Sequence, residues 1–387
     1  MALALPVYDP QAPDRVLLKS GYELTQGSID KLIELGMRSV WVRYPSLQFV
    51  EKFVDPQVLI AQGRLVQQIS DSFTQLQSQA SAKLPYDEYC KSIGTLVAQL
   101  VSNPDAAVFM GDLASDGGDG LMRHSSSVTY LSVLMGLRLE GYLIKQRRHV
   151  DPARAKEVTN LGLGAMLHDL GVTQLDPAVK QRYYASGDES DPQWRDHTRL
   201  GFELVRGRVE PSAATVVRHH HQRYDGSGYA GREDAALAGS AIHVFARIVG
   251  LAEQFDRICH PAGLPPQPTA WALGAILQTG LFDKFDPTVI HALFEVTPPY
   301  PPGSAVQLSD GRWAVCLDHA PSNPCCPKVQ ITPPPDAIRD DDSPGEIIDL
   351  SRTDGELRIA RYQNRDMSDF NFTPPDFTTQ AALAAGW

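Results

Sequence analysis

Apolar residues in the middle of the chain recur with the 3.6-residue period of amphipathic helices. Between Pro56 and about Ala80, for example, Val58, Leu65 and Ile69 return to one helical face. The pattern continues to residue 297, with proline and glycine where helices are expected to start and stop. The further predicted helices span residues 86–101, 120–144, 152–168, 192–205, 212–221, 240–258, 269–278 and 287–296.

The two ends of the chain carry short β patterns instead. Near the N-terminus, Val16–Leu18 and Tyr22–Leu24 are strand-like, and Ser28 is the expected N-cap of a short helix that ends at Gly36. Near the C-terminus, a β-hairpin and two further strands are predicted at residues 306–317, 328–331 and 346–350.

These patterns predict a mainly α protein, in which a helical bundle carries a small N-terminal α+β unit and a small C-terminal β appendage. With 387 residues, 43% of them hydrophobic and 21% charged, the chain has a globular composition and a length typical of two or three domains. The expected parts are an α+β unit (1–55), a helical linker region (56–119), the main helical domain (120–297), the β appendage (298–362) and a tail (363–387).

Charge and cysteine content indicate which partners and which cellular compartment to expect. The net charge is −11 and no basic block is present, which argues against DNA or an anionic membrane as a partner. A phosphate-containing substrate would therefore need local neutralisation, for which a bound metal is the usual solution. Five unevenly spaced cysteines favour a reducing compartment, and neither a signal peptide nor a stretch of about 20 apolar residues is visible. We expect a cytoplasmic protein.

Most of the eleven histidines lie at or near the ends of predicted helices. His124 is early in one helix, His168-Asp169 ends another, His197 lies in a third, and His219–His221 ends a fourth. Imidazoles and carboxylates brought together from several helices of a bundle form di-metal sites, and two cations can bind both oxygens of an in-line displacement at phosphorus. The sequence thus predicts a di-metal phosphoesterase, with Asp169 suited to bridge two cations.

The same residues resemble the HD-GYP domain, a bacterial subclass of the HD metal-dependent phosphohydrolases that hydrolyses cyclic di-GMP. The most specific part is His220-His221 followed by Asp225-Gly226-Ser227-Gly228-Tyr229, and the resemblance covers residues 120–297. It implies an enzyme that converts cyclic di-GMP to pGpG, and it leaves open whether pGpG is hydrolysed further to GMP. Cyclic di-GMP, diguanylate cyclases and a second copy of the chain are the partners that it suggests.

The resemblance also implies a ligand set for two divalent metal ions, with Fe or Mn as the favoured elements. One ion would be held by His124, His168, Asp169 and Glu253, and the other by Asp169 as a bridge with His197, His220 and His221. His168 and Asp169 would be catalytic. Asp225, Gly226, Gly228 and Tyr229 would bind the substrate.

Several positions depart from the family's pattern. Glu253 stands where the family has Asp, and Val172 replaces the Lys that follows HD-x-Gly, which removes a cation facing an anionic substrate. Gln222 replaces a Glu, and residues 257–261 keep little of the family's Arg-rich segment. These departures leave a second reading open, namely a degenerate domain that binds metal or cyclic di-GMP with little turnover.

Overall fold

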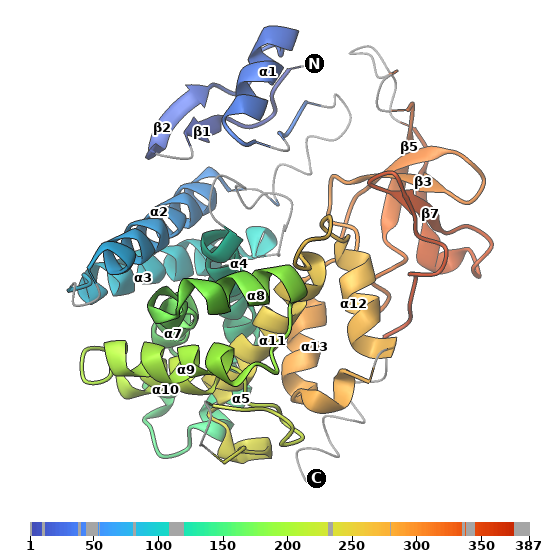
Figure 1. Cartoon of the computed structure of the whole chain (residues 1–387). Helices are drawn as coiled ribbons and strands as arrows, with labels where there is room; N and C mark the ends of the chain where they lie inside the picture. Colours follow the sequence, from blue (N-terminus) through green and yellow to red (C-terminus); the bar gives the residue numbers. More distant parts are fainter. Residues whose placement is uncertain are drawn as a thin grey trace.

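The computed structural model confirms the expected fold class: a helical bundle with a small α+β unit at the N-terminus and a β-sheet at the C-terminus (Figure 1). The structure describes residues 2–9, 12–37, 40–43, 53, 55–79, 83–107, 120–230, 235–278, 280–334, 337 and 345–374. Part of the predicted tail, residues 375–387, lies outside these ranges. Within them, no helix combines the length and the apolar character that a crossing of a lipid bilayer requires.

Many helices of the bundle start with an acidic residue followed by proline. In α2, α6, α8, α9 and α13 an Asp side chain accepts a hydrogen bond from the backbone N–H two residues later, and Pro occupies the first helical position. The bundle consists of α2 (Pro56–Ser78), α3 (Tyr86–Ser102), α4 (Gly120–Arg138), α5 (Glu140–Gln146), α6 (Pro152–Ala155), α7 (Thr159–Leu167), α8 (Pro177–Ser186), α9 (Pro192–Val205), α10 (Pro211–His219), α11 (Val244–Cys259), α12 (Thr269–Gln278) and α13 (Pro287–Val296). Short 3₁₀ segments are η2 (Pro104–Ala106), η4 (Leu170–Gln174), η5 (Gly239–Ala241), η6 (Phe282–Lys284) and η7 (Leu350–Arg352).

The helix predictions differ from the structure in four places. Helix α11 starts at Val244 rather than at residue 240, since residues 239–241 form η5. The segment 120–144 is not one helix, because α4 ends at Arg138 and α5 starts at Glu140. Leu139 and Leu143 are both buried, so the apolar period continues across this break and conceals it. Likewise 152–168 divides into α6 and α7. Helix α8 was not predicted, since Val179 is its only buried residue and leaves almost no amphipathic signal.

The core of the bundle surrounds α7, in which all residues from Leu161 to Leu167 are buried. A helix that is buried on all sides belongs to the centre of a domain. Helix α7 contacts α3, α4, α10 and α11, so the residues at its C-terminal end lie where these helices meet. His168 and Asp169 occupy that position.

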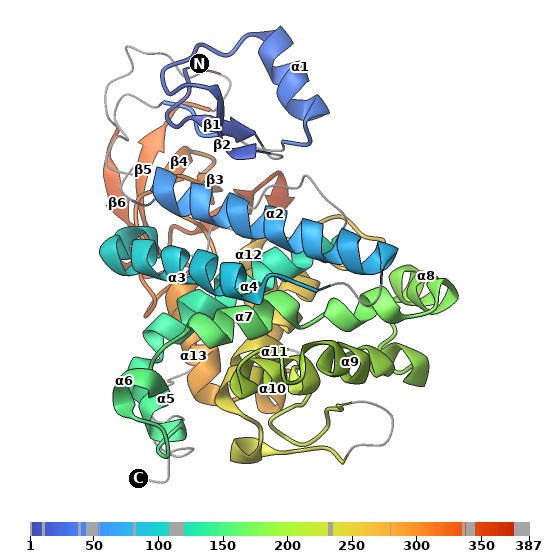
Figure 2. The same ribbon diagram turned by 90° about the vertical axis from the view of Figure 1, so that its left-hand side faces the viewer.

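The N-terminal unit pairs β1 (Val7–Asp9) with β2 (Ala12–Leu18) and places α1 (Gln26–Glu34) beside them. The predicted N-cap is wrong: Thr25 caps α1, and Ser28 instead completes a capping box from the third helical position. Only β2 matches a predicted strand here, because Glu23 makes a single bridge to Ala2. Figures 1 and 2 show this unit at one end of the bundle, next to α2.

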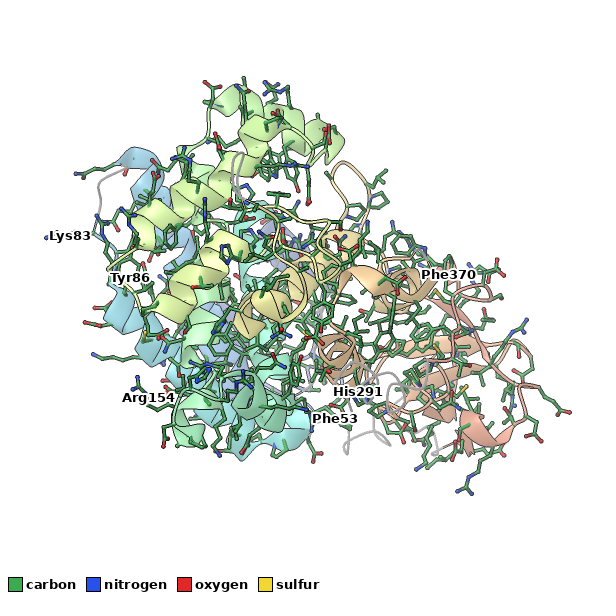
Figure 3. All side chains as sticks on the ribbon, turned by 90° about the horizontal axis from the view of Figure 1, so that it is seen from below. Phe53, Lys83, Tyr86, Arg154, His291 and Phe370 are labelled. Carbon is green, nitrogen blue, oxygen red and sulfur yellow. The ribbon has the colours of Figure 1, made fainter. Side chains whose placement is uncertain are left out.

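The C-terminal sheet is antiparallel, with strand order β6-β5-β4-β3-β7-β8. Its strands are β3 (Ala305–Leu308), β4 (Trp313–Cys316), β5 (Lys328–Thr332), β6 (Ile347–Asp349), β7 (Ile359–Tyr362) and β8 (Arg365–Asp366). The first four fall in the predicted hairpin and strands, whereas β7 and β8 were not predicted. The segment after β8 meets the bundle at α12, where Trp271 and Phe370 pack edge to face with ring centroids 6.4 Å apart. Figure 3 labels Phe370.

Candidate metal centre

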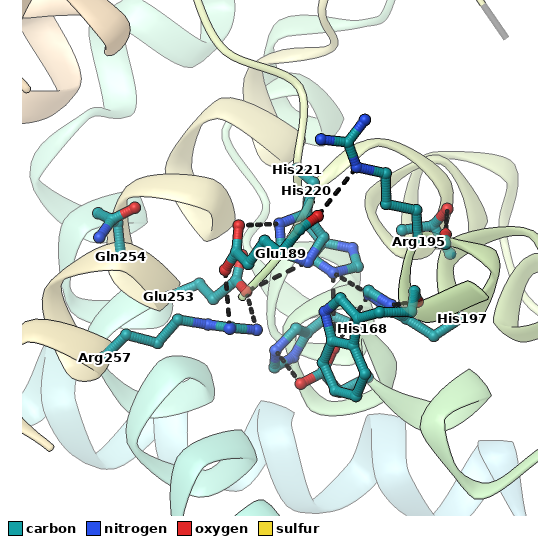
Figure 4. Close-up of polar contacts among 12 residues, drawn as sticks. His168, Glu189, Arg195, His197, His220, His221, Glu253, Gln254 and Arg257 are labelled. Atoms are coloured by element: carbon teal, nitrogen blue, oxygen red, sulfur yellow. Dashed lines mark hydrogen bonds and ion pairs between the residues drawn. The ribbon is translucent and has the colours of Figure 1, made fainter. Parts of the chain in front are cut away.

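Seven side chains from five parts of the bundle meet at the end of α7. His168 ends this helix, and Asp169 opens η4. The other five come from α4, α9, the end of α10 and α11, and they are His124, His197, His220, His221 and Glu253. His124 is 8% exposed, and each of the other six is at most 1% exposed. These are the seven residues that the resemblance implied as metal ligands. Figure 4 labels five of them, namely His168, His197, His220, His221 and Glu253.

Asp169 lies between two groups of imidazoles. Its Oδ2 is 3.8 Å from Nε2 of His124 and 3.5 Å from Nε2 of His168. Its Oδ1 is 3.5 Å from Nε2 of His197 and 3.6 Å from Nε2 of His220. Each carboxylate oxygen therefore faces a different pair of histidines, which is the arrangement that a bridging ligand requires.

The spacing of the nitrogens fits metal coordination. Nε2 of His124 lies 3.3 Å from Nε2 of His168, and Nε2 of His197 lies 3.4 Å from Nε2 of His220. Two nitrogens bound to one ion at about 2.1 Å are roughly 3.0–3.4 Å apart. Ligand atoms within 4.8 Å of one another form two main groups: Asp169, His197, His220 and His221, and His124, His168 and Glu253.

Hydrogen bonds on the far side of the rings fix their tautomers. Nδ1 of His168 lies 2.7 Å from the carbonyl of Ala165, and Nδ1 of His197 lies 2.7 Å from that of Trp194. A carbonyl only accepts, so Nδ1 carries the proton and Nε2 offers its lone pair to the centre. Burial lowers the pKa of His168 to about 3 and that of His197 to about 4, which keeps both rings neutral at pH 7.

Unpartnered buried atoms provide the test of whether a cation fits here. Oδ1 of Asp169, both ring nitrogens of His221 and Oε2 of Glu253 are buried without a hydrogen-bond partner, whereas Oε1 of Glu253 lies 2.6 Å from Nη2 of Arg257. Burial raises the pKa of Glu253, and the nearby Glu189 and Asp169 carboxylates reinforce the shift. Burying such groups unpaired is costly, whereas a divalent cation would satisfy them together. The donor set therefore fits bound metal.

Asp256 is a functional candidate that the sequence reasoning missed. Its Oδ2 accepts a hydrogen bond of 2.7 Å from Nδ1 of His124, and Arg123 holds the other oxygen at 3.2 Å. Carboxylates in this position orient a ligating imidazole and raise its basicity. The available signal was spacing, because Asp256 follows Glu253 by three residues and so shares its helical face.

Glu189 and Arg257 also lie at the centre and were also missed. Oε2 of Glu189 is 3.7 Å from Nδ1 of His221, and Glu189, His221 and Glu253 form a third group of close ligand atoms. Arg257 makes ion pairs with Glu189 and with Glu253. Its position four residues after Glu253 was a usable signal, whereas nothing in the sequence around Glu189 indicated that it would reach the centre.

Of the predicted substrate-binding residues, Tyr229 contacts a histidine of the centre. Its ring stacks on His221 with centroids 4.6 Å apart, and its backbone N–H donates to the carbonyl of His221. A Cβ on Gly228 would lie 2.4 Å from that same carbonyl, so only glycine permits this return of the chain. Gly226 has φ +84°, and the Asp225 carboxylate accepts hydrogen bonds from Ser227, so these two residues shape the loop.

Two departures from the family's pattern have clear structural settings. Val172 is 0% exposed and packs in the bundle core, so position 172 offers the centre no cation. Gln222 is buried, and its Oε1 accepts a hydrogen bond of 2.9 Å from the backbone of Leu237. This hydrogen bond joins Gln222, the residue after the histidine pair, to the backbone at Leu237.

Comparisons with known proteins identify similar sequences. Residues 139–289 match the family model of the HD domain. The chain is 27% identical over 257 residues to the cyclic di-GMP phosphodiesterase PA4108 of Pseudomonas aeruginosa, covering 64% of this chain and 58% of that protein. It is 33% identical over 146 residues to the cyclic di-GMP phosphodiesterase response regulator RpfG of Xanthomonas campestris, covering 36% of each. The chain thus spans less than two thirds of the length of these relatives.

Among solved structures, Bd1817, an HDG"Y"P protein from Bdellovibrio bacteriovorus, aligns with 76% of this chain and 94% of its own, at 17% identity and a TM-score of 0.45. The similarity to the family comes from the sequence matches and the motif. Residues 139–289 thus match the HD domain, and the paired histidines with the Asp225–Tyr229 loop resemble the HD-GYP group of that family.

Proposed function

We propose that the protein is a metal-dependent phosphodiesterase that hydrolyses cyclic di-GMP to pGpG; whether it hydrolyses pGpG further to GMP is an outcome of the assay below. The observation that carries the proposal is Asp169, with one carboxylate oxygen facing His124 and His168 and the other facing His197 and His220. The substrate is inferred from relatives that are named cyclic di-GMP phosphodiesterases. Two ions, Fe or Mn, are proposed as the cofactor.

The proposed ligands form two sets, one for each metal ion. His124, His168, Asp169 and Glu253 would hold one ion, and Asp169, His197, His220 and His221 would hold the other. When bound, two divalent cations polarise water and neutralise charge that develops on the phosphate.

The surrounding residues position these ligands and cover them. Backbone carbonyls orient His168 and His197, and the Asp256 carboxylate orients His124. The Tyr229 ring covers one face of His221 and limits the access of solvent to it. The protein would thus supply a rigid, largely buried set of ligands whose lone pairs already point inward, which reduces the reorganisation needed during the reaction.

The test is chromatography of cyclic di-GMP after incubation with protein loaded with Mn²⁺ or Fe²⁺. Wild-type protein should form pGpG, a chelator should stop the reaction, and His220→Ala should abolish it. His219→Ala is a matched control, since the adjacent histidine belongs to none of the ligand groups found among the described residues. It should retain turnover.

The same assay distinguishes an enzyme from a receptor. If cyclic di-GMP binds to the metal-loaded wild type but remains intact over hours, the phosphodiesterase proposal is refuted and the degenerate domain is supported. If neither binding nor turnover occurs while two metals are present, the substrate has been wrongly assigned. Unfolding curves of His220→Ala and His219→Ala should match the wild type, so that a loss of activity reports on the site.

A further inference from the structure

Arg257 lies next to the metal centre and pairs with two carboxylates at once. It follows Glu253 by four residues on α11, so both side chains project from the same helical face (Figure 4). Its Nη2 is 2.6 Å from Oε1 of Glu253, and its Nη1 is 2.7 Å from Oε1 of Glu189. The guanidinium therefore joins a proposed metal ligand to a second carboxylate that comes from a loop.

The two carboxylates differ in how firmly they are held. The Glu253 side chain is 0% exposed, whereas that of Glu189 is 28% exposed. Glu189 lies in the connection between α8 and α9, where Arg195 Nε donates a hydrogen bond of 2.9 Å to its backbone carbonyl. The backbone of the loop is thus anchored, while the Glu189 carboxylate can move without loss of that anchor.

Other arginines around the centre have less exchangeable partners. Arg123 pairs with Asp256, which is 2% exposed, and Arg223 donates to the backbone carbonyl of His220. The lysine that the family has after HD-x-Gly is replaced here by Val172, whose side chain packs in the core and supplies no cation. Arg257 therefore lies next to the proposed metal ligand Glu253, and its other partner, Glu189, is one that another anion could replace. A guanidinium binds phosphate with the same paired N–H donors that it presents to a carboxylate.

We propose that Arg257 binds a phosphate oxygen of the substrate, and that Glu189 is an internal counterion which the phosphate displaces. In the free protein, Glu189 occupies the place of the phosphate and keeps the guanidinium of Arg257, whose side chain is 17% exposed, paired. This inference rests on the proposed function only in that the substrate is a phosphodiester. In this proposal the cation that contacts the phosphate is Arg257 of α11, whereas the family's lysine follows the HD motif at the position of Val172.

The test measures binding of inorganic phosphate to the metal-loaded full chain by titration calorimetry. Arg257→Gln should weaken binding about tenfold or more, the range for loss of a hydrogen bond between charged groups. Glu189→Gln should strengthen binding by about threefold or more, because it keeps the size of the competitor but removes its charge. The double variant should bind like Arg257→Gln alone.

Arg182→Gln is the matched control. Arg182 pairs with Asp191 of the same connection at 2.8 Å, but it is 53% exposed and belongs to α8. Phosphate affinity should stay within about twofold of the wild type, since exposed ion pairs contribute little.

Two results would overturn the proposal. If Arg257→Gln and Glu189→Gln both weaken phosphate binding, the ion pair is structural and no exchange takes place. If either variant loses metal, as measured by elemental analysis, the residue holds the metal ligands rather than phosphate. Turnover of cyclic di-GMP is measured separately: opposite effects of the two variants on phosphate binding in a protein without turnover would support the role of Arg257 while refuting the proposed function.

Discussion

Replacing Gly171 with Ala tests how the fold positions one side of the metal centre. Gly171 lies in η4, two residues after Asp169, and packs against the backbone of α9. A Cβ at this position would lie 1.9 Å from the carbonyl oxygen of His197 and 2.5 Å from the backbone nitrogen of Gly201. Real Cβ contacts stay above 3.0 Å, so α9 and η4 would have to separate by at least 1.1 Å (3.0 minus 1.9).

The neighbours are backbone atoms of a helix, so they cannot yield by a change of rotamer. Overpacking against side chains costs about 1–3 kcal/mol, and we expect about 3 kcal/mol or more here. The separation is also about twice the 0.5 Å to which a functional constellation must be held. His197 should therefore move away from Asp169, and the protein should lose metal as well as stability.

Urea unfolding followed by circular dichroism, together with elemental analysis, measures both effects. Gly94→Ala is the matched control, because Gly94 lies inside α3 and a Cβ there meets nothing within 4 Å. This variant should be stabilised by about 0.5–1 kcal/mol through its higher helix propensity. A Gly171→Ala protein with the wild-type urea midpoint and full metal content would refute the close packing of η4 on α9.

Three further predictions concern the centre. Asp169→Ala should lose both metals together, whereas His197→Ala should mainly empty one site; full occupancy by elemental analysis in Asp169→Ala would contradict the bridge. Asp256→Asn should weaken metal binding about 10–100-fold in a competition with a chelating dye, because the amide no longer orients His124 as a carboxylate does. Val172→Lys should lower the free energy of unfolding by about 2 kcal/mol or more, since position 172 is buried, and an unchanged urea midpoint would show that the lysine reaches solvent.

Much of the bundle could be predicted because its helices carry strong local signals. The bounds of α9, α12 and α13 agree with the predicted ranges, and Pro192, Thr269 and Pro287 are their first residues. Where the local signal is weak or continuous, prediction failed. Helix α8 buries almost nothing, and the break at Leu139 interrupts no apolar period.

Some residues of the candidate site could likewise be predicted from the sequence, and others could not. Its histidines could be grouped from sequence because they stand at helix ends in a specific motif, although their role as ligands stays a prediction. Arg257 and Asp256 share a helical face with Glu253, which spacing could have indicated. Glu189 could not be found, since its approach to His221 depends on how the connection between α8 and α9 folds back over the bundle.

The burial of α4 has a consequence for dissecting the protein into fragments. The HD family match starts at residue 139, after this helix, yet α4 packs against α7, α11 and α13, and 13 of its residues, His124 included, are buried. A fragment cut at the start of the match would expose the apolar sides of three helices to water and would remove a member of the ligand cluster. The smallest fragment with a closed core must therefore start before Gly120, well ahead of residue 139, where the HD family match starts.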